Sequence, residues 1–144
     1  MILHAGLIAC RLRGLWQGVL ITGPSGAGKS DLALRALDRG FRLVADDRVL
    51  VWASEGRLYG RAPDTLRGLI EVRGVDVLSV EPLPLCEVAL VAQIGKPERI
   101  PDFATETIFG VAVPLLAVAP FEASAPAKLS RAMQAFDAAH KRRI

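Results

Sequence analysis

Residues 19–30 restrict the fold of this sequence more than any other stretch, because a short apolar run leads directly into a glycine-rich loop. The G-x-x-x-x-G-K-[ST] spacing is present in Gly23, Gly28, Lys29 and Ser30. In this spacing backbone N–H groups surround phosphates, the lysine reaches the β- and γ-phosphates, and the hydroxyl binds Mg²⁺. The stretch therefore predicts a buried strand, a phosphate-binding loop and a helix whose positive end faces the anion. A glycine-rich turn without a ligand is the alternative.

The composition predicts one domain over residues 1–144, because a chain of this length with 51% hydrophobic residues can bury a core without disulfides. Cys10 and Cys86 are far apart, which favours buried thiols over zinc or a disulfide. Residues 111–121 are too short an apolar run to cross a bilayer, so we expect a cytoplasmic protein with no membrane contact. Part of the net charge of +3 lies in a basic tail. This is typical of a solvated helix end, so no nucleic-acid partner is expected.

The rest of the chain alternates apolar runs with turn-forming residues. Residues 2–10 predict a strand, and residues 11–18 are expected to turn into the strand before the loop. The apolar face of residues 29–39 predicts a helix that stops at Gly40. Further strands are expected over residues 41–45, 49–52, 57–59 and 86–94, one or two more within 107–118, and a last helix over 130–142 with Met133, Phe136 and Ala139 facing inward.

Four charged residues are candidates for the same site. Asp46 and Asp47 follow the strand expected at residues 41–45. On the usual plan of a parallel sheet, this acid pair leaves a strand beside the loop strand and faces the phosphates across a metal ion. Capping of the next segment is the alternative for either aspartate. Glu71 and Arg73 share one face of an extended segment, which predicts either a surface ion pair or part of the site.

Three stretches, residues 19–30, residues 39–47, and Pro63 with residues 69–74, together resemble the catalytic domain of the HPr kinase/phosphorylase family. They are similar to its phosphate loop, its R-G-x-x-L-V-A-D-D segment and its E-I-R-G signature. The resemblance implies an α/β fold, a P-loop-containing domain with a mixed central sheet, related to phosphoenolpyruvate carboxykinase and assembled as a hexamer. It also implies ATP- and Mg²⁺-dependent phosphorylation of a serine on the phosphocarrier protein HPr, which regulates carbohydrate and phosphotransferase-system metabolism, often with a reverse phosphorolysis.

Position by position, the resemblance implies nucleotide contacts along the whole loop. These residues are Gly23, Pro24, Ser25, Gly26, Ala27, Gly28, Lys29 and Ser30. Lys29 would be the phosphate-binding catalytic lysine. Ser30 and Glu71 would lie on the Mg²⁺ side of the site.

The remaining roles fall on an acid pair and two basic residues. Asp47 would accept the proton of the attacking serine, in agreement with the need of a hydroxyl nucleophile for a carboxylate. Asp46 would support the site or bind the metal, and Arg73 would orient Glu71. His4 is similar to the family's active-site histidine.

The sequence also departs from the family. Pro24 occupies a loop position that is usually acidic, and Asp76 stands where glycine is common. The match begins at His4, which predicts a short form without the amino-terminal regulatory domain. Residues 115–124 contain no arginine, so the arginine expected there cannot be assigned, and the phosphorylase direction stays open. Two other functions stay open: a P-loop kinase for a small metabolite, and a non-catalytic, nucleotide-gated regulatory binding protein.

Overall fold

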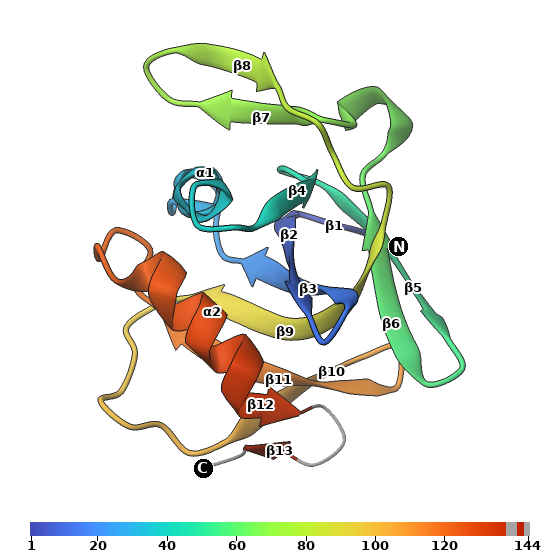
Figure 1. Ribbon diagram of the computed structural model, residues 1–144, viewed down its shortest axis with the longest axis vertical. Helices are drawn as coiled ribbons and strands as arrows, with labels where there is room; N and C mark the ends of the chain where they lie inside the picture. The colour runs from blue at the N-terminus through green and yellow to red at the C-terminus, as the bar shows by residue number, and fades with distance from the viewer. Residues whose placement is uncertain (138–140, 143–144) are drawn as a thin grey trace.

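A computed structural model gives the fold of the chain and describes residues 1–137, 141 and 142 (Figure 1). The elements in chain order are β1 (Ile2–Leu3), β2 (Ala5–Leu12), β3 (Leu15–Thr22), α1 (Lys29–Leu37), β4 (Arg42–Ala45), β5 (Val49–Ser54), β6 (Arg57–Arg61), the 3₁₀ helix η1 (Asp64–Leu66), β7 (Leu69–Val72), β8 (Asp76–Ser79), β9 (Cys86–Ile94), β10 (Ala104–Ile108), β11 (Val111–Val118), α2 (Ala125–Ala135), β12 (Phe136–Asp137) and β13 (Lys141–Arg142).

A mixed sheet is the centre of the molecule. Its strands follow the order β1-β5-β6-β9-β3-β2-β4, and β11 joins it along the end of β9 and carries β10 on its other side. β3, β9 and β11 are parallel, whereas β2 is antiparallel to both β3 and β4. The predicted α/β fold with a mixed central sheet is therefore confirmed.

The order of β3 and β4 differs from the prediction. We expected the acid pair to leave the strand beside the loop strand, but β2 lies between β3 and β4. Because β2 is antiparallel to both, β3 and β4 still run in the same direction and end at the same edge of the sheet. Ala5, the first residue of β2, pairs with Thr22, and its N–H donates to the carbonyl of Asp47 at 3.2 Å. The start of β2 therefore lies between the loop and the acid pair.

The connection between β2 and β3 is tighter than predicted. Residues 11–18 do not form a long turn, since β2 runs to Leu12 and β3 begins at Leu15. Arg13 and Gly14 make the turn with φ of 52° and 80°. Positive φ at both central residues matches the twist of a two-residue hairpin, so the strands continue to the turn.

Helix α1 begins at Lys29, as predicted, and ends two residues earlier than expected. Its buried residues are Leu32, Ala33 and Ala36, which face the sheet. Side chains of the sheet strands alternate between two cores. Ile8 packs with α1 and α2 on one face, whereas Leu7 packs with β4, β5 and β6 on the other.

Helix α2 is displaced from its predicted position at residues 130–142. It begins at Ala125 with Pro126 in its first turn, where proline costs the helix no hydrogen bond. Met133 is buried as predicted, but the chain becomes extended at Phe136, with φ −98° and ψ 143°. Ala139 lies outside the described residues.

The segment containing Glu71 and Arg73 forms a small separate sheet. β7 and β8 pair antiparallel in a hairpin that projects over α1, at the top of Figure 1. Arg73 lies in the turn after β7 rather than in an extended run with Glu71, because β7 ends at Val72. Strand β9, Cys86–Ile94, has the predicted bounds. Neither described helix has the length and apolar character required to traverse a bilayer.

Candidate active site

The glycine-rich loop connects the end of β3 to the start of α1. Gly26 and Gly28 have φ of 78° and 106°, which side chains other than glycine rarely adopt. The Ala27 N–H donates to the Pro24 carbonyl at 3.2 Å and closes a turn within the loop. The first intrahelical bond of α1 runs from the Leu32 N–H to the Gly28 carbonyl. The amides before Leu32 have no partner within the helix and are available to an anion.

Lys29 folds back over the loop that precedes it. Its Nζ donates to the carbonyl oxygens of Gly23 at 2.6 Å and Pro24 at 2.9 Å. These two contacts hold the ammonium group at the rim of the loop, on the same side as the amino end of α1. The lysine charge and the helix dipole therefore favour negative charge at the same position.

Asp46 is buried and joins three parts of the molecule. Among the described residues, Asp46 is the one charged residue that is buried, with 6% of its surface exposed. The Ser30 hydroxyl donates to Oδ1 at 2.7 Å, and the Glu71 N–H donates to Oδ2 at 3.0 Å. The carboxylate thus ties the first turn of α1 and the hairpin strand β7 to the end of β4. We expect a structural effect from its removal.

Asp47 is exposed, whereas its neighbour Asp46 is buried. Its φ is 71°, and the Arg48 N–H donates to the Asp46 carbonyl at 2.8 Å, which makes a γ-turn of the rarer, strained form. Strained backbone of this kind is common at functional sites. The Asp47 side chain is 68% exposed, and Oδ2 lies 3.7 Å from Nε of Arg48.

Glu71 and Arg73 form an exposed ion pair, with Nε of Arg73 4.0 Å from Oε1 of Glu71. Their side chains are 61% and 79% exposed, so the pair itself contributes little to stability. Both residues also border the cavity beside the loop. Of the two alternatives from the sequence, the surface ion pair is confirmed, and membership of the site stays a prediction that their place at the cavity allows.

One cavity of about 350 Å³ brings most of the predicted site residues together. Its lining residues are Ser25, Gly26, Gly28, Lys29, Ser30, Asp31, Leu34, Asp47, Glu71, Val72, Arg73 and Phe121. Gly23, Pro24 and Ala27 belong to the loop but do not line this cavity, and Asp46 lies beneath it. His4 is exposed and precedes the Ala5 amide that contacts Asp47, but it is not a lining residue.

The donors around this cavity fit a phosphate chain with a divalent cation. The Ser30 hydroxyl commits its proton to Asp46, so its oxygen lone pairs are available to a cation. Asp47 and Glu71 add carboxylate oxygens, the donors that Mg²⁺ prefers. No three His, Cys, Asp or Glu side chains converge into a complete metal cage in the described part of the chain. Mg²⁺ in nucleotide sites takes one or two carboxylates together with phosphate oxygens, and this donor set is of that kind.

A larger cavity lies elsewhere and shares no residue with the phosphate loop. It measures about 450 Å³ and is bordered by the β2–β3, β5–β6 and β10–β11 turns and by α2. These turns precede β3 and β11, so the cavity lies at the edge opposite the carboxyl ends of the parallel strands. Ligands of open α/β sheets bind at the carboxyl ends, which favours the smaller cavity as the site.

The sequence pattern did not indicate Phe121 as a cavity residue. Phe121 belongs to the loop between β11 and α2, more than 90 positions after Gly28, and contacts that glycine only through the fold. Nothing in the neighbouring residues marks this position as functional.

The mixed sheet and the loop between strand and helix define an α/β domain of the P-loop kinase type. Residues 4–84, more than half of the chain, match the family described as HPr Serine kinase C-terminal domain. The chain belongs to this family.

Curated relatives and a solved structure agree with that assignment. The HPr kinase/phosphorylase of Limosilactobacillus reuteri (strain DSM 20016) is 41% identical over 116 residues, covering 70% of this chain and 36% of that protein. The HPr kinase/phosphorylase of Clostridium tetani is 50% identical over 66 residues, covering 46% of this chain and 22% of that protein. The chain thus spans about a third or less of the length of these relatives. The structure of the Hpr(Ser) kinase/phosphatase from Coxiella burnetii matches with a TM-score of 0.77 and 28% identity, over 93% of this chain and 94% of that one.

Proposed function

We propose that residues 1–144 act as one catalytic domain, a protein-serine kinase that transfers the γ-phosphoryl group of ATP to a serine of the phosphocarrier protein HPr. One observation carries the proposal. Lys29, Ser30, Asp47 and Glu71 all line the same cavity beside the glycine loop. The names of the relatives supply HPr as the substrate, because they are HPr kinases. Regulation of carbohydrate metabolism in the cytoplasm follows from that substrate.

Binding of the nucleotide falls to the loop and the start of α1. The loop amides and the free N–H groups of α1 hold the phosphates, and Lys29 exchanges its carbonyl contacts for the β- and γ-phosphate oxygens. Ser30 and Glu71 would hold Mg²⁺, and Arg73, which pairs with Glu71, would orient it. When bound, Mg²⁺ neutralises charge on the β- and γ-phosphates.

Proton transfer falls to Asp47. Its carboxylate takes the proton of the acceptor serine while the serine oxygen bonds to the γ-phosphorus, and the bond from that phosphorus to the bridging oxygen of ADP breaks. The positive φ of Asp47 turns the carboxylate outward, so a hydroxyl can reach it from solvent. His4 follows as a proposed neighbour of the acceptor, since Ala5 contacts the backbone of Asp47.

The exposure of Asp47 favours a protein substrate over a small metabolite. A metabolite kinase encloses its acceptor to exclude water, whereas 68% of this side chain is accessible. Arg48 and Arg73 are also exposed nearby, at 52% and 79%. A serine on a protein surface can approach such a site.

The direct test is incubation of the chain with purified HPr, Mg²⁺ and ATP labelled in the γ-phosphate. We expect label on a serine of HPr, no label when that serine is replaced by alanine, and a loss of several orders of magnitude for Lys29→Ala in a chain that circular dichroism shows to be folded at the assay temperature. Nucleotide binding without any labelled HPr would refute the substrate and favour the non-catalytic regulator. Near-normal turnover of Lys29→Ala would refute the site.

The assembly is a separate proposal. The family resemblance implies a hexamer, and we propose a homo-oligomer of that kind. Sedimentation equilibrium of the purified chain tests it, and a monomer at micromolar concentration would contradict it.

A further inference from the structure

A phenylalanine lies exposed at the mouth of the phosphate site. Phe121 belongs to the loop between β11 and α2, and 70% of its surface is accessible. The tip of its ring faces Gly28, because a Cβ on that glycine would lie 2.7 Å from Cζ of Phe121. The sides of the ring are therefore open while its edge touches the loop that binds phosphates. Other exposed apolar side chains of this chain, such as Ile100 and Phe109, do not line the cavity beside the loop, whereas Phe121 does.

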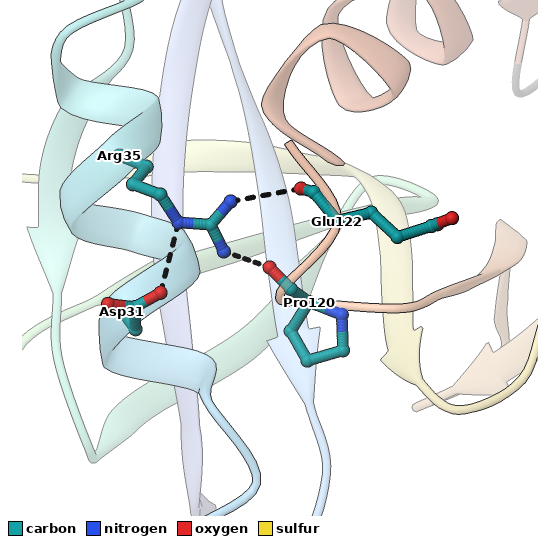
Figure 2. Close-up of polar contacts among 4 residues, drawn as sticks. All are labelled: Asp31, Arg35, Pro120 and Glu122. Carbon is teal, nitrogen blue, oxygen red and sulfur yellow. Dashed lines mark hydrogen bonds and ion pairs between the residues drawn. The ribbon is translucent and has the colours of Figure 1, made fainter. Parts of the chain in front are cut away.

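Arg35 of α1 fixes the loop that carries this ring. Figure 2 shows its guanidinium group donating to two backbone carbonyls, those of Pro120 and of Glu122, the latter at 3.1 Å. The same group pairs through Nε with Asp31 at 3.0 Å. The residues on both sides of Phe121 are thus held by the helix that begins at the phosphate loop. The ring keeps its place relative to Gly28 without burial in the core.

The cavity that Phe121 lines has both apolar and polar walls. The apolar lining residues are Leu34, Val72 and Phe121, whereas the loop residues, Lys29 and Ser30 supply backbone amides and polar groups. A nucleotide has this division of chemistry: a charged phosphate chain at one end and a flat aromatic base at the other. Bases stack on aromatic side chains whose faces are open.

We propose that Phe121 is the platform on which the nucleotide base stacks, with Arg35 as the positioning residue that holds it. Phe121 thereby makes the site prefer a nucleoside triphosphate over an inorganic polyphosphate. The proposal rests on the proposed phosphate-binding role of the loop. It assigns a function to a segment that the family match at residues 4–84 does not reach.

The test is calorimetric binding of Mg²⁺–ATP and of Mg²⁺–tripolyphosphate to the wild-type chain and to Phe121→Ala. Stacking of one base predicts that Phe121→Ala loses on the order of tenfold in affinity for ATP and none for tripolyphosphate. Phe121→Trp should keep the wild-type affinity for ATP. Phe109→Ala is the matched control, because Phe109 is also exposed, at 49%, but lies in the β10–β11 turn at the opposite edge of the sheet.

The outcomes separate the proposal from the proposed function. Equal losses for both ligands would mean that Phe121 only shapes the loop, and an unchanged ATP affinity would mean that the ring faces another partner, such as the protein substrate. Either result overturns the base platform. If the wild-type chain binds neither ligand, the phosphate role of the loop fails, and the base platform fails with it. Tripolyphosphate binding by both proteins with a selective loss of ATP supports the proposal.

Discussion

The buried carboxylate of Asp46 and the exposed carboxylate of Asp47 offer a sharp test of the site, because adjacent residues have different surroundings. Asp46→Ala removes the acceptor of two hydrogen bonds, one from the Ser30 hydroxyl at 2.7 Å and one from the Glu71 N–H at 3.0 Å. Asp47→Asn removes a charge from a side chain that is 68% exposed. The first change should lower stability, and the second should lower activity.

The magnitude follows from the two contacts of Asp46. A hydrogen bond to a charged group contributes about 1.5 to 3 kcal/mol, and Ser30 is partly exposed, so its hydroxyl can turn to water after the change. We therefore expect Asp46→Ala to lower the free energy of unfolding by about 3 kcal/mol. For a domain of this size, that loss corresponds to a melting temperature lower by about 6 to 12 °C. Asp46→Asn keeps one carbonyl acceptor for the Glu71 N–H and should cost about 1 kcal/mol.

For Asp47→Asn we expect almost no loss of stability and a large loss of turnover. An exposed substitution changes the free energy of unfolding by less than about 0.5 kcal/mol, whereas loss of a general base lowers turnover by about 10² to 10⁴. Asp64→Asn is the matched control, because Asp64 is exposed and paired with Arg61 at 3.2 Å outside the cavity.

Thermal unfolding followed by circular dichroism, together with the labelled HPr assay, measures both effects on the same samples. Full transfer activity in Asp47→Asn would refute the role of that carboxylate. A melting temperature unchanged in Asp46→Ala would refute the bridging role of Asp46.

Two further predictions concern the core. Burial, with smaller contributions from the charge of Glu87 and from Cys10, raises the pKa of Cys86 to about 12, so iodoacetamide at pH 8 should modify the folded chain far more slowly than the chain in denaturant; equal rates would contradict this. Gly18→Ala should lower the free energy of unfolding by about 1 to 3 kcal/mol, because the new Cβ would lie 2.6 Å from Sγ of Cys86. Gly95→Ala, which meets no atom within 4 Å, is the control, and an equal loss there would contradict the reasoning.

The local parts of the site could be predicted because their signals are short. The apolar run, the glycine spacing and the apolar face of α1 lie within residues 19–37, so the strand, loop and helix follow from neighbouring residues. The position of β2 could not be predicted in this way. Its place between β3 and β4 depends on pairing over distant positions, and an antiparallel strand there satisfies the same apolar pattern as a parallel neighbour.

The start of α2 and the contact of Phe121 with Gly28 were not predicted, for two separate physical reasons. The helix predicted at residues 130–142 begins at Ala125 instead, because Pro126 in its first turn loses no helical hydrogen bond. The contact of Phe121 with Gly28 depends on Arg35, whose two carbonyl partners lie on a loop more than 80 positions away. No periodic or composition signal reports such a contact.

Strand β2 lies between β3, which leads into the phosphate loop, and β4, which leads into Asp46 and Asp47. It therefore sets the distance between the ends of those two strands. Adjacent strands are about 4.8 Å apart, so the ends of β3 and β4 are separated by about 10 Å. Directly neighbouring strands would bring the end of β4, and Asp47 with it, about 5 Å closer to the loop. If Asp47 is the proposed general base, this intervening strand is what sets its distance from the phosphate loop.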